Sequence, residues 1–143
     1  MTLDDWVAVS APGSGDLLLQ MDIEGAEWPV LLNVSRATLR RFRIIVVELH
    51  DLTKVLDRDV LPVLRAMLHR LLDDFHVVHL HPNNSGGLIR LGAVAVPRTL
   101  EMTLLRRDRA PVAGYTEHFA HPLDCPNAED IPDVELPFVW YAP

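Results

Sequence analysis

Three short segments of the chain are almost wholly apolar, and each predicts a β-strand. Leu17–Met21 and Ile44–Leu49 are nearly uninterrupted apolar runs, and the second begins with four β-branched residues. Phe75–His81 is a third segment of strand length that is rich in apolar residues. Runs of this kind are typical of strands that helices cover on both faces, so we expect Leu17–Met21 to be buried on both sides.

Apolar residues between these segments recur at helical spacing. The clearest helix carries one apolar stripe within residues 59–73, made of Val60, Leu64, Met67, Leu68, Leu71 and Leu72. Trp28–Leu32 predicts a shorter helix that has Pro29 in its first turn, the only helical turn where proline is well tolerated. Thr2 and Asp5 have the spacing of a capping box, which predicts a short helix at the start of the chain.

The order strand, helix, strand, helix, strand is the signature of an α/β fold with a right-handed, parallel sheet. Leu100–Leu104 alternates apolar and polar residues, which predicts a half-exposed strand near a sheet edge. Residues 88–96 are interrupted by glycine and fit no single conformation. Six of the eleven prolines follow residue 110. We therefore divide the chain into a domain over residues 1–109 and a proline-rich tail over residues 110–143 that packs on it.

Polar side chains follow the predicted strands at the points where the strands end. In wound parallel sheets the ligand site lies beyond the carboxyl ends of the strands. That rule selects Asp22, Glu24, His50, Asp51, His81 and Asn83. Asp22 follows directly on an apolar run and is the strongest candidate for chemistry. Glu24 and Glu27 would equally suit the unpaired amides of a helix N-terminus.

Histidines at the strand ends also permit a metal site. His79 and His81 lie two residues apart on one predicted strand, so their side chains face the same side. Asp22, His50 and His81 could together bind a divalent metal ion, or the histidines could take part in acid–base chemistry.

Other motifs in the sequence are incomplete. Gly13–Gly15 contains Gly-x-Gly but no third glycine, and a strand rather than a helix follows, so a nucleotide-binding loop is not expected. His118, His121 and Cys125 resemble part of a zinc site that lacks a fourth ligand. The sequence has no Gly-x-Ser-x-Gly elbow for a serine nucleophile.

Composition narrows the function classes further. The 143 residues suit about one domain, and the formal net charge of −7 with scattered basic residues disfavours nucleic acid as a partner. Cys125 is the single cysteine, so a disulfide-bonded secreted scaffold is not expected. The first residues are acidic and no apolar run is long enough to cross a bilayer, so we expect a cytoplasmic protein without membrane contacts.

Two segments carry a resemblance to a known family. Leu19–Glu27 reads LQMDIEGAE and Val46–His50 reads VVELH. These resemble the C-terminal half of FkbM-type S-adenosylmethionine-dependent methyltransferases, in which an Asp-x-Glu-Gly-x-Glu signature ends the fourth strand and a Val-Glu-x-His ending closes the fifth. His81–Asn84 and the Leu100–Thr103 segment extend the resemblance.

The resemblance implies a Rossmann-like methyltransferase half-sheet of three parallel strands plus an antiparallel strand, with crossover helices. It implies S-adenosylmethionine as the methyl donor and a small-molecule acceptor, methylated in this family mostly on hydroxyl oxygens. By resemblance the catalytic residues are Asp22, Glu24 and His50. The substrate-binding residues would be Glu48, His81, Asn83 and Asn84.

One departure from the family limits this interpretation. The glycine-rich turn that holds the cofactor lies earlier in the family's domain and is missing from this sequence. We therefore expect a truncated domain that does not bind S-adenosylmethionine alone and is inactive alone. We also expect the exposed edge of Leu17–Met21 to pair with a second copy or a complementary chain, unless residues 2–9 or the tail cover it. A non-catalytic binding or assembly module is the alternative.

Overall fold

The computed structural model describes residues 1–111, 114–116 and 119–140. Its α-helices are α1 (Leu3–Ser10), α2 (Glu27–Asn33), α3 (Arg36–Leu39) and α4 (Leu61–Asp74). Its strands are β1 (Leu17–Met21), β2 (Phe42–Leu49), β3 (Phe75–Pro82), β4 (Leu88–Leu91), β5 (Val94–Pro97) and β6 (Leu100–Arg106). Short 3₁₀ helices are η1 (Leu52–Leu56), η2 (Arg107–Arg109) and η3 (Phe138–Trp140).

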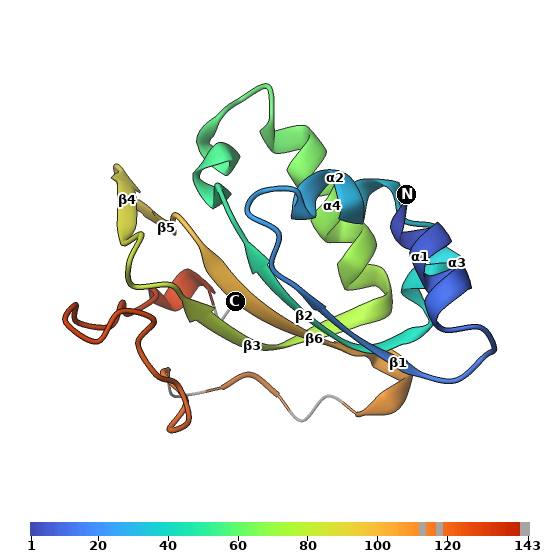
Figure 1. Ribbon diagram of the computed structural model, residues 1–143. Helices are drawn as coiled ribbons and strands as arrows, with labels where there is room; N and C mark the ends of the chain where they lie inside the picture. Colours follow the sequence, from blue (N-terminus) through green and yellow to red (C-terminus); the bar gives the residue numbers. More distant parts are fainter. Residues whose placement is uncertain (112–113, 117–118, 141–143) are drawn as a thin grey trace.

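The main sheet is mixed and has the strand order β1-β2-β6-β3 (Figure 1). β1 and β2 form the parallel pair, with Met21 opposite Val47. β6 pairs antiparallel with β2 and with β3. The α/β class is therefore confirmed. The expected group of three parallel strands is confirmed only for β1 and β2, because β6 lies between β2 and β3.

Two predictions about strand environment were wrong. β6 was expected near an edge, but it lies inside the sheet between β2 and β3. Its alternating burial arises because one face packs on the core and the other face is only partly covered. β1 was expected to be buried on both faces, but Leu18 is 61% exposed, whereas Leu19 and Met21 are buried.

The helices lie on one side of the sheet, and the C-terminal segment runs along the other side (Figure 1). The capping box of α1 is present, since the Thr2 side chain accepts from the Asp5 amide and the Asp5 carboxylate accepts from the Thr2 amide. On α4, the stripe residues Leu64, Met67 and Leu71 are buried in the core. The capping box confirms the predicted helix at the start of the chain, and the buried stripe shows which face of α4 packs on the core.

Residues 88–96, for which the sequence favoured no conformation, lie in the antiparallel β4–β5 hairpin, which ends at Pro97. The C-terminal segment is anchored beside it. The Trp140 indole donates to the Ala95 carbonyl at 2.9 Å, and Leu136 is 1% exposed. In the described part of the chain, no helix has both the length and the apolar character that a membrane span requires.

Candidate functional site

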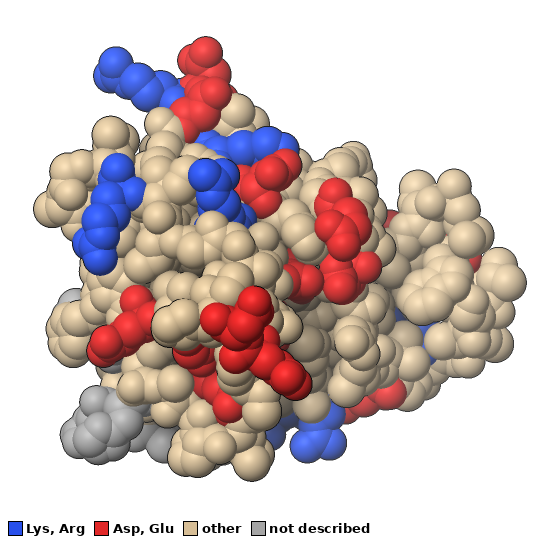
Figure 2. All heavy atoms as spheres, turned by 60° about the vertical axis from the view of Figure 1, so that its left-hand side comes forward, with Lys and Arg blue, Asp and Glu red and all other residues tan. Residues whose placement is uncertain are grey.

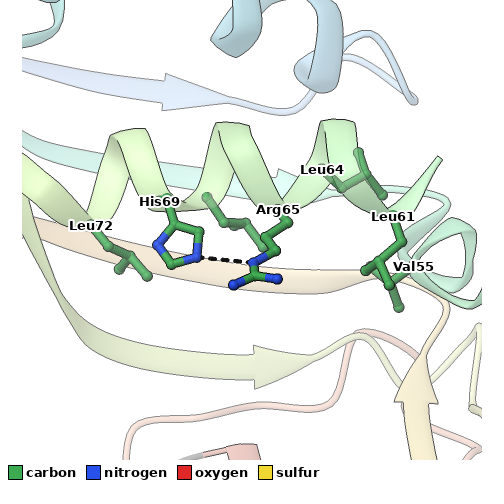
Figure 3. A pocket seen from close by; sticks show the side chains of 7 residues that line it. Val55, Leu61, Leu64, Arg65, His69 and Leu72 are labelled. Atoms are coloured by element: carbon green, nitrogen blue, oxygen red, sulfur yellow. Dashed lines mark hydrogen bonds between the residues drawn. The ribbon is translucent and has the colours of Figure 1, made fainter. Parts of the chain in front are cut away.

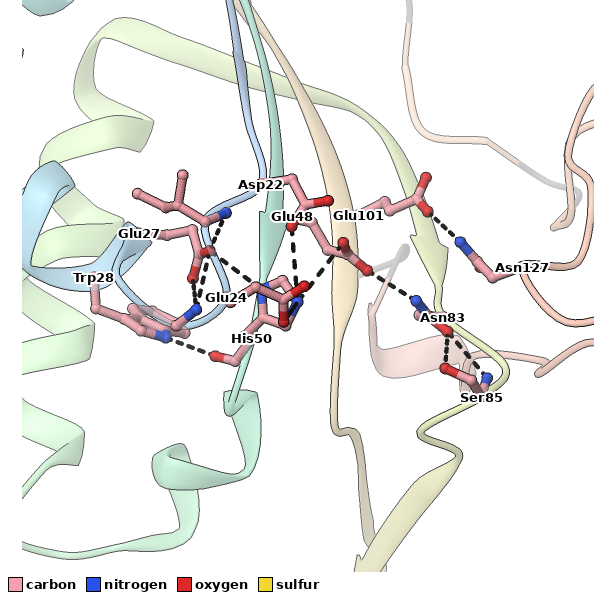
Figure 4. Close-up of polar contacts among 12 residues, drawn as sticks. Asp22, Glu24, Glu27, Trp28, Glu48, His50, Asn83, Ser85, Glu101 and Asn127 are labelled. Carbon is pink, nitrogen blue, oxygen red and sulfur yellow. Dashed lines mark hydrogen bonds and ion pairs between the residues drawn. The ribbon is translucent and has the colours of Figure 1, made fainter.

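The carboxyl ends of β1 and β2 lie side by side and bring one histidine among four carboxylates (Figure 4). His50 follows β2, and its Nδ1 lies 3.2 Å from Glu27 Oε1. The Nε2 of the same ring faces the other three carboxylates, at 3.4 Å from Glu24 Oε2, 3.7 Å from Glu48 Oε2 and 3.9 Å from Asp22 Oδ1. The structure thus brings together all three residues predicted as catalytic.

Glu27 is the structural centre of this corner. Its side chain is fully buried, and its carboxylate accepts backbone hydrogen bonds from Ile23 at 2.9 Å and from Gly25 at 3.1 and 3.2 Å. Burial alone would raise the pKa of Glu27, but these amide donors and His50 hold it below its ordinary value. Glu27 therefore binds the amides of the loop before α2, and its own amide, the first of that helix, also lowers the pKa of the carboxyl.

Both strand-to-helix turns contain a non-glycine residue in the left-handed region. Glu24 has φ 55° and Asp51 has φ 52°. Gly25 follows at φ 100°, and a Cβ there would lie 3.7 Å from Asp51 Oδ2. Left-handed backbone at non-glycine residues is uncommon and concentrates at functional sites. Here it directs the Glu24 side chain back toward His50.

His50 has defined partners on its backbone and on both ring nitrogens. The Trp28 indole donates to the His50 carbonyl at 2.7 Å, which fixes the turn after β2. Nδ1 makes a hydrogen bond with Glu27, whereas Nε2 makes only longer ion-pair contacts, so we assign the proton of the neutral ring to Nδ1 and the lone pair to Nε2. Burial would lower the pKa of His50, but Glu27, Glu48 and Glu24 outweigh it and raise that pKa above its ordinary value.

Glu48 connects this corner to the end of β3. Burial and the nearby carboxylates of Asp22 and Glu101 raise the pKa of Glu48, despite the hydrogen bond that it accepts from Asn83 at 2.9 Å. The side-chain oxygen Oδ1 of Asn83 in turn accepts from the Ser85 amide at 3.0 Å. Glu48 and Asn83, both predicted to bind substrate, are therefore in contact with each other and with the site.

The other two predicted substrate residues lie away from His50. His81 is buried on β3, with its Nε2 at 3.3 Å from Asp133 Oδ2 and its Nδ1 at 3.8 Å from Glu101 Oε2. The Asn84 side chain donates to the carbonyls of Ala128 and Ile131 at 2.9 and 2.8 Å. These contacts hold the C-terminal segment against the sheet, and they give both side chains a structural role.

The metal site expected from Asp22, His50 and His81 is not formed as predicted. In the described residues, the group that could hold a metal ion is Asp22, Glu27 and His50, whose ligand atoms lie within 4.8 Å of one another. Glu27 replaces His81 in this group because β6 separates β2 from β3. The Glu27 carboxylate already accepts hydrogen bonds from backbone amides, which a metal ion would have to displace.

The partial zinc motif is not supported in the described residues. His118 lies outside them. The ring nitrogen Nδ1 of His121 accepts from the Leu123 amide at 3.2 Å, and Cys125 is exposed.

A polar pocket of about 280 Å³ opens beside His50, lined by Glu24, His50, Asp51, Thr53, Gly86, Arg98 and Thr99. Carboxylates are prominent on the side of the molecule that Figure 2 shows. Sequence reasoning missed Arg98 and Thr99, which follow β5 just beyond the stretch whose conformation it left open. It also missed the contact of Trp28 with His50, which no spacing rule indicates.

A second pocket of about 290 Å³ lies along α4 and is mostly aliphatic (Figure 3). Its polar side chains are Arg65 and His69, and the Arg65 guanidinium donates to His69 Nε2 at 3.3 Å. It therefore offers no group comparable to the His50 cluster.

Comparison with known proteins identifies one family. Residues 1–71 match the methyltransferase FkbM domain, a stretch that includes Asp22, Glu27, Glu48 and His50. Neither the curated proteins nor the solved structures include a match to this chain.

Proposed function

We propose, from the match of residues 1–71 to the methyltransferase FkbM domain, that the site serves O-methyl transfer from S-adenosylmethionine. The observation that carries the proposal is the His50 ring, held between Glu27 on one nitrogen and three carboxylates on the other. A hydroxyl acceptor needs a base to take its proton, and this histidine is placed and oriented for that role.

His50 would take the proton through Nε2, the nitrogen that faces the pocket side of the cluster. Glu27 fixes the tautomer through Nδ1, so the lone pair of the neutral ring is on Nε2. The raised pKa of His50 makes it a stronger base than an ordinary histidine. The acceptor oxygen becomes bonded to the methyl carbon, and its proton moves to Nε2.

The carboxylates around His50 suit the charge of the donor. S-adenosylmethionine, when bound, supplies an electrophilic methyl group on a cationic sulfonium, which becomes a neutral thioether once the carbon–sulfur bond breaks. Asp22 and Glu24 are exposed carboxylates on the rim, at 54% and 85% side-chain exposure, and could face such a cation. Glu48, held by Asn83, would keep the acceptor's proton near His50.

A methyl-transfer assay with His50→Gln tests this role. In a form of the protein that transfers a radiolabelled methyl group, wild-type kcat/KM should rise with pH as His50 loses its proton. His50→Gln should lose this rise and lose at least about tenfold in rate, within the range of general-base catalysis. His69→Gln, an exposed histidine on α4, is the matched control and should leave the profile unchanged. An unchanged profile in His50→Gln would refute the proposed base.

Donor binding by this chain alone is a separate question. We infer that residues 1–143 do not bind S-adenosylmethionine by themselves, because the family's glycine-rich turn is not in this sequence. Titration calorimetry at up to about 1 mM ligand detects interactions of roughly −4 kcal/mol. A stoichiometric isotherm would contradict this inference without contradicting methyl transfer.

Metal-dependent chemistry is the second candidate, and the grouping of Asp22, Glu27 and His50 favours it. It predicts stoichiometric binding of Zn²⁺ or Mn²⁺ at neutral pH that is lost in Asp22→Asn. Calorimetry with each metal decides between the candidates, because proton transfer by His50 requires its Nε2 to be free of a metal ion.

A further inference from the structure

The polar pocket beside His50 contains two charged side chains of opposite sign that have no strong partner. Arg98 forms no side-chain hydrogen bond or ion pair with the residues that the structure describes. Glu24 is 85% exposed, and its one ion pair is the 3.4 Å contact with His50. Asp51 differs from both, because Lys54 binds it at 2.8 Å. The pocket thus presents a cation without a side-chain partner among the described residues and an exposed anion that is paired with His50.

The backbone that carries Arg98 is fixed on three sides. The Arg98 amide donates to the Gly87 carbonyl at 3.1 Å, and the Leu52 amide donates to the Arg98 carbonyl at 2.9 Å. The carbonyl of the next residue, Thr99, accepts from the Asn83 amide at 3.1 Å. Arg98 is therefore held by the turn after β3, by η1 and by the end of β3, and its position does not depend on a side-chain partner.

Gly86 makes this arrangement possible. A Cβ at Gly86 would lie 3.1 Å from the Arg98 Cβ, closer than such atoms normally approach. A larger residue at Gly86 would require the base of the arginine side chain to shift slightly. The close approach places a guanidinium in a pocket whose other charged groups are acidic or titratable.

The charges and the size of the pocket indicate the chemical class of a ligand that it would bind. A guanidinium binds a carboxylate through paired, charge-assisted hydrogen bonds, and an exposed carboxylate suits an ammonium group. At about 280 Å³ the pocket is slightly below the roughly 300–1,000 Å³ of sites for drug-sized molecules, so it suits a small metabolite. A hydroxyl on the same molecule would complete the set, since His50 also lines this pocket.

We propose that the acceptor is a free hydroxy-α-amino acid, with its carboxylate on Arg98, its ammonium on Glu24 and its hydroxyl toward His50. That this molecule is the methyl acceptor rests on the proposed function, but its binding in the pocket does not. S-adenosylmethionine also ends in an α-amino acid group, so the same chemistry could come from the donor. The pocket is assigned to the acceptor because His50 and the two threonines give it hydroxyl partners.

Binding of L-threonine to the chain, measured by NMR titration without a methyl donor, tests the proposal. Arg98→Gln should weaken binding at least tenfold, which is about 1.4 kcal/mol. Arg90→Gln, an exposed arginine on β4 that does not line the pocket, is the matched control and should stay within twofold. Gly86→Ala keeps Arg98 but displaces it, and it should weaken binding as well.

Two analogues separate the charged contacts. Threoninol lacks the carboxylate, so it should bind weakly and equally to wild type and Arg98→Gln. N-acetyl-L-threonine lacks the ammonium group, so Glu24→Gln should not weaken its binding further. Equal binding of threonine and threoninol, or no detectable threonine binding at 50-fold molar excess and about 50 mM, overturns the proposal.

Other outcomes of these measurements distinguish the proposed methyl transfer from the proposed ligand. Binding of S-adenosylmethionine that depends on Arg98, without binding of threonine, would overturn the acceptor assignment. Arg98-dependent threonine binding in a form of the protein that binds S-adenosylmethionine but transfers no methyl group would refute the proposed function and support the ligand assignment. An active methyltransferase that does not bind threonine would refute the ligand assignment alone.

Discussion

Glu27→Gln is the most informative single substitution for the architecture of the site. Glutamine keeps the size of the side chain but replaces one carboxylate oxygen with an amide that can only donate. The two oxygens of Glu27 together face the amides of Ile23 and Gly25 and Nδ1 of His50. One of these donors must then face another donor inside a fully buried environment.

The expected cost follows from these contacts. A hydrogen bond to a charged group contributes about 1.5–3 kcal/mol, and a buried donor without a partner costs about 1–3 kcal/mol. Loss of one carboxylate also relieves repulsion with Glu48 and Asp22, which offsets part of the cost. We expect Glu27→Gln to lower the free energy of unfolding by about 2–4 kcal/mol at pH 7.

Glu24→Gln is the matched control for this measurement. It removes the same charge from the same cluster, but Glu24 is 85% exposed and accepts no backbone hydrogen bond in the described contacts. Its substitution should change the free energy of unfolding by less than about 1 kcal/mol. Urea unfolding followed by circular dichroism and by tryptophan fluorescence gives both values. Equal destabilisation by the two substitutions would refute the argument that backbone contacts distinguish Glu27.

The pH dependence provides a second check on Glu27. Its pKa is lowered in the folded chain, so its charged form stabilises the fold above the unfolded pKa of about 4.3. That contribution is lost as the pH falls through the folded pKa. The difference between wild type and Glu27→Gln should therefore shrink below about pH 4. A difference that stays constant from pH 7 to pH 3 would show that the charge is not responsible.

Four further predictions test other parts of the structure. Asp22→Asn should lower kcat in an active form of the protein more than it lowers Tm, because a rim carboxylate acts on charge and not on packing; equal kcat would show that Asp22 has no chemical role. Leu64→Ala should lower the free energy of unfolding by about 2–5 kcal/mol in urea, because Leu64 is 3% exposed; a cost below about 1 kcal/mol would place it outside the core. The raised pKa of His50 means that its stabilisation is complete below about pH 6.5 and is lost as the pH rises through its folded pKa. His50→Gln should therefore cost more stability at pH 5.5 than at pH 8.5, and the reverse order would contradict the raised pKa. Light scattering at micromolar concentration should show self-association, because β1 pairs only with β2 among the described strands and Leu17–Met21 has no lysine or proline to protect its outer side; a monomer whose amides there exchange freely would contradict it.

Local sequence signals predicted the elements well, because each depends on neighbours within one or two turns. The Leu17–Met21 run forms β1 with the predicted bounds, and the capping box at Thr2 opens α1. Burial was less predictable. An apolar run indicates that both faces of a strand can be buried, but whether another element covers each face depends on the rest of the fold. Leu18 is exposed for that reason.

The candidate site was predictable wherever it depends on adjacent parallel strands. Asp22 and His50 follow β1 and β2, whose paired ends meet at one side of the sheet. Glu27 was recognised as a carboxylate at a helix start, but its contacts with loop amides depend on the positive φ of Glu24 and Gly25. Arg98 could not be predicted, because its position depends on contacts with η1 and with the turn between β3 and β4, two segments that are separate in sequence.

His81 shows how strand order decides which residues can act together. Its prediction as a partner of His50 rested only on the position of both residues at the ends of predicted strands. β6 pairs with both β2 and β3, so the ends of β2 and β3 are two strand spacings apart, or roughly 10 Å. Metal ligands bind within about 2.0–2.6 Å of the ion, so ligand atoms on neighbouring positions must approach within about 5 Å. Side chains can bridge the gap, as Glu48 and Asn83 do, but the His81 ring has Asp133 and Glu101 as its partners and does not join the His50 cluster. The antiparallel strand β6 therefore separates the candidate site at His50 from the contact at His81, where the C-terminal segment attaches.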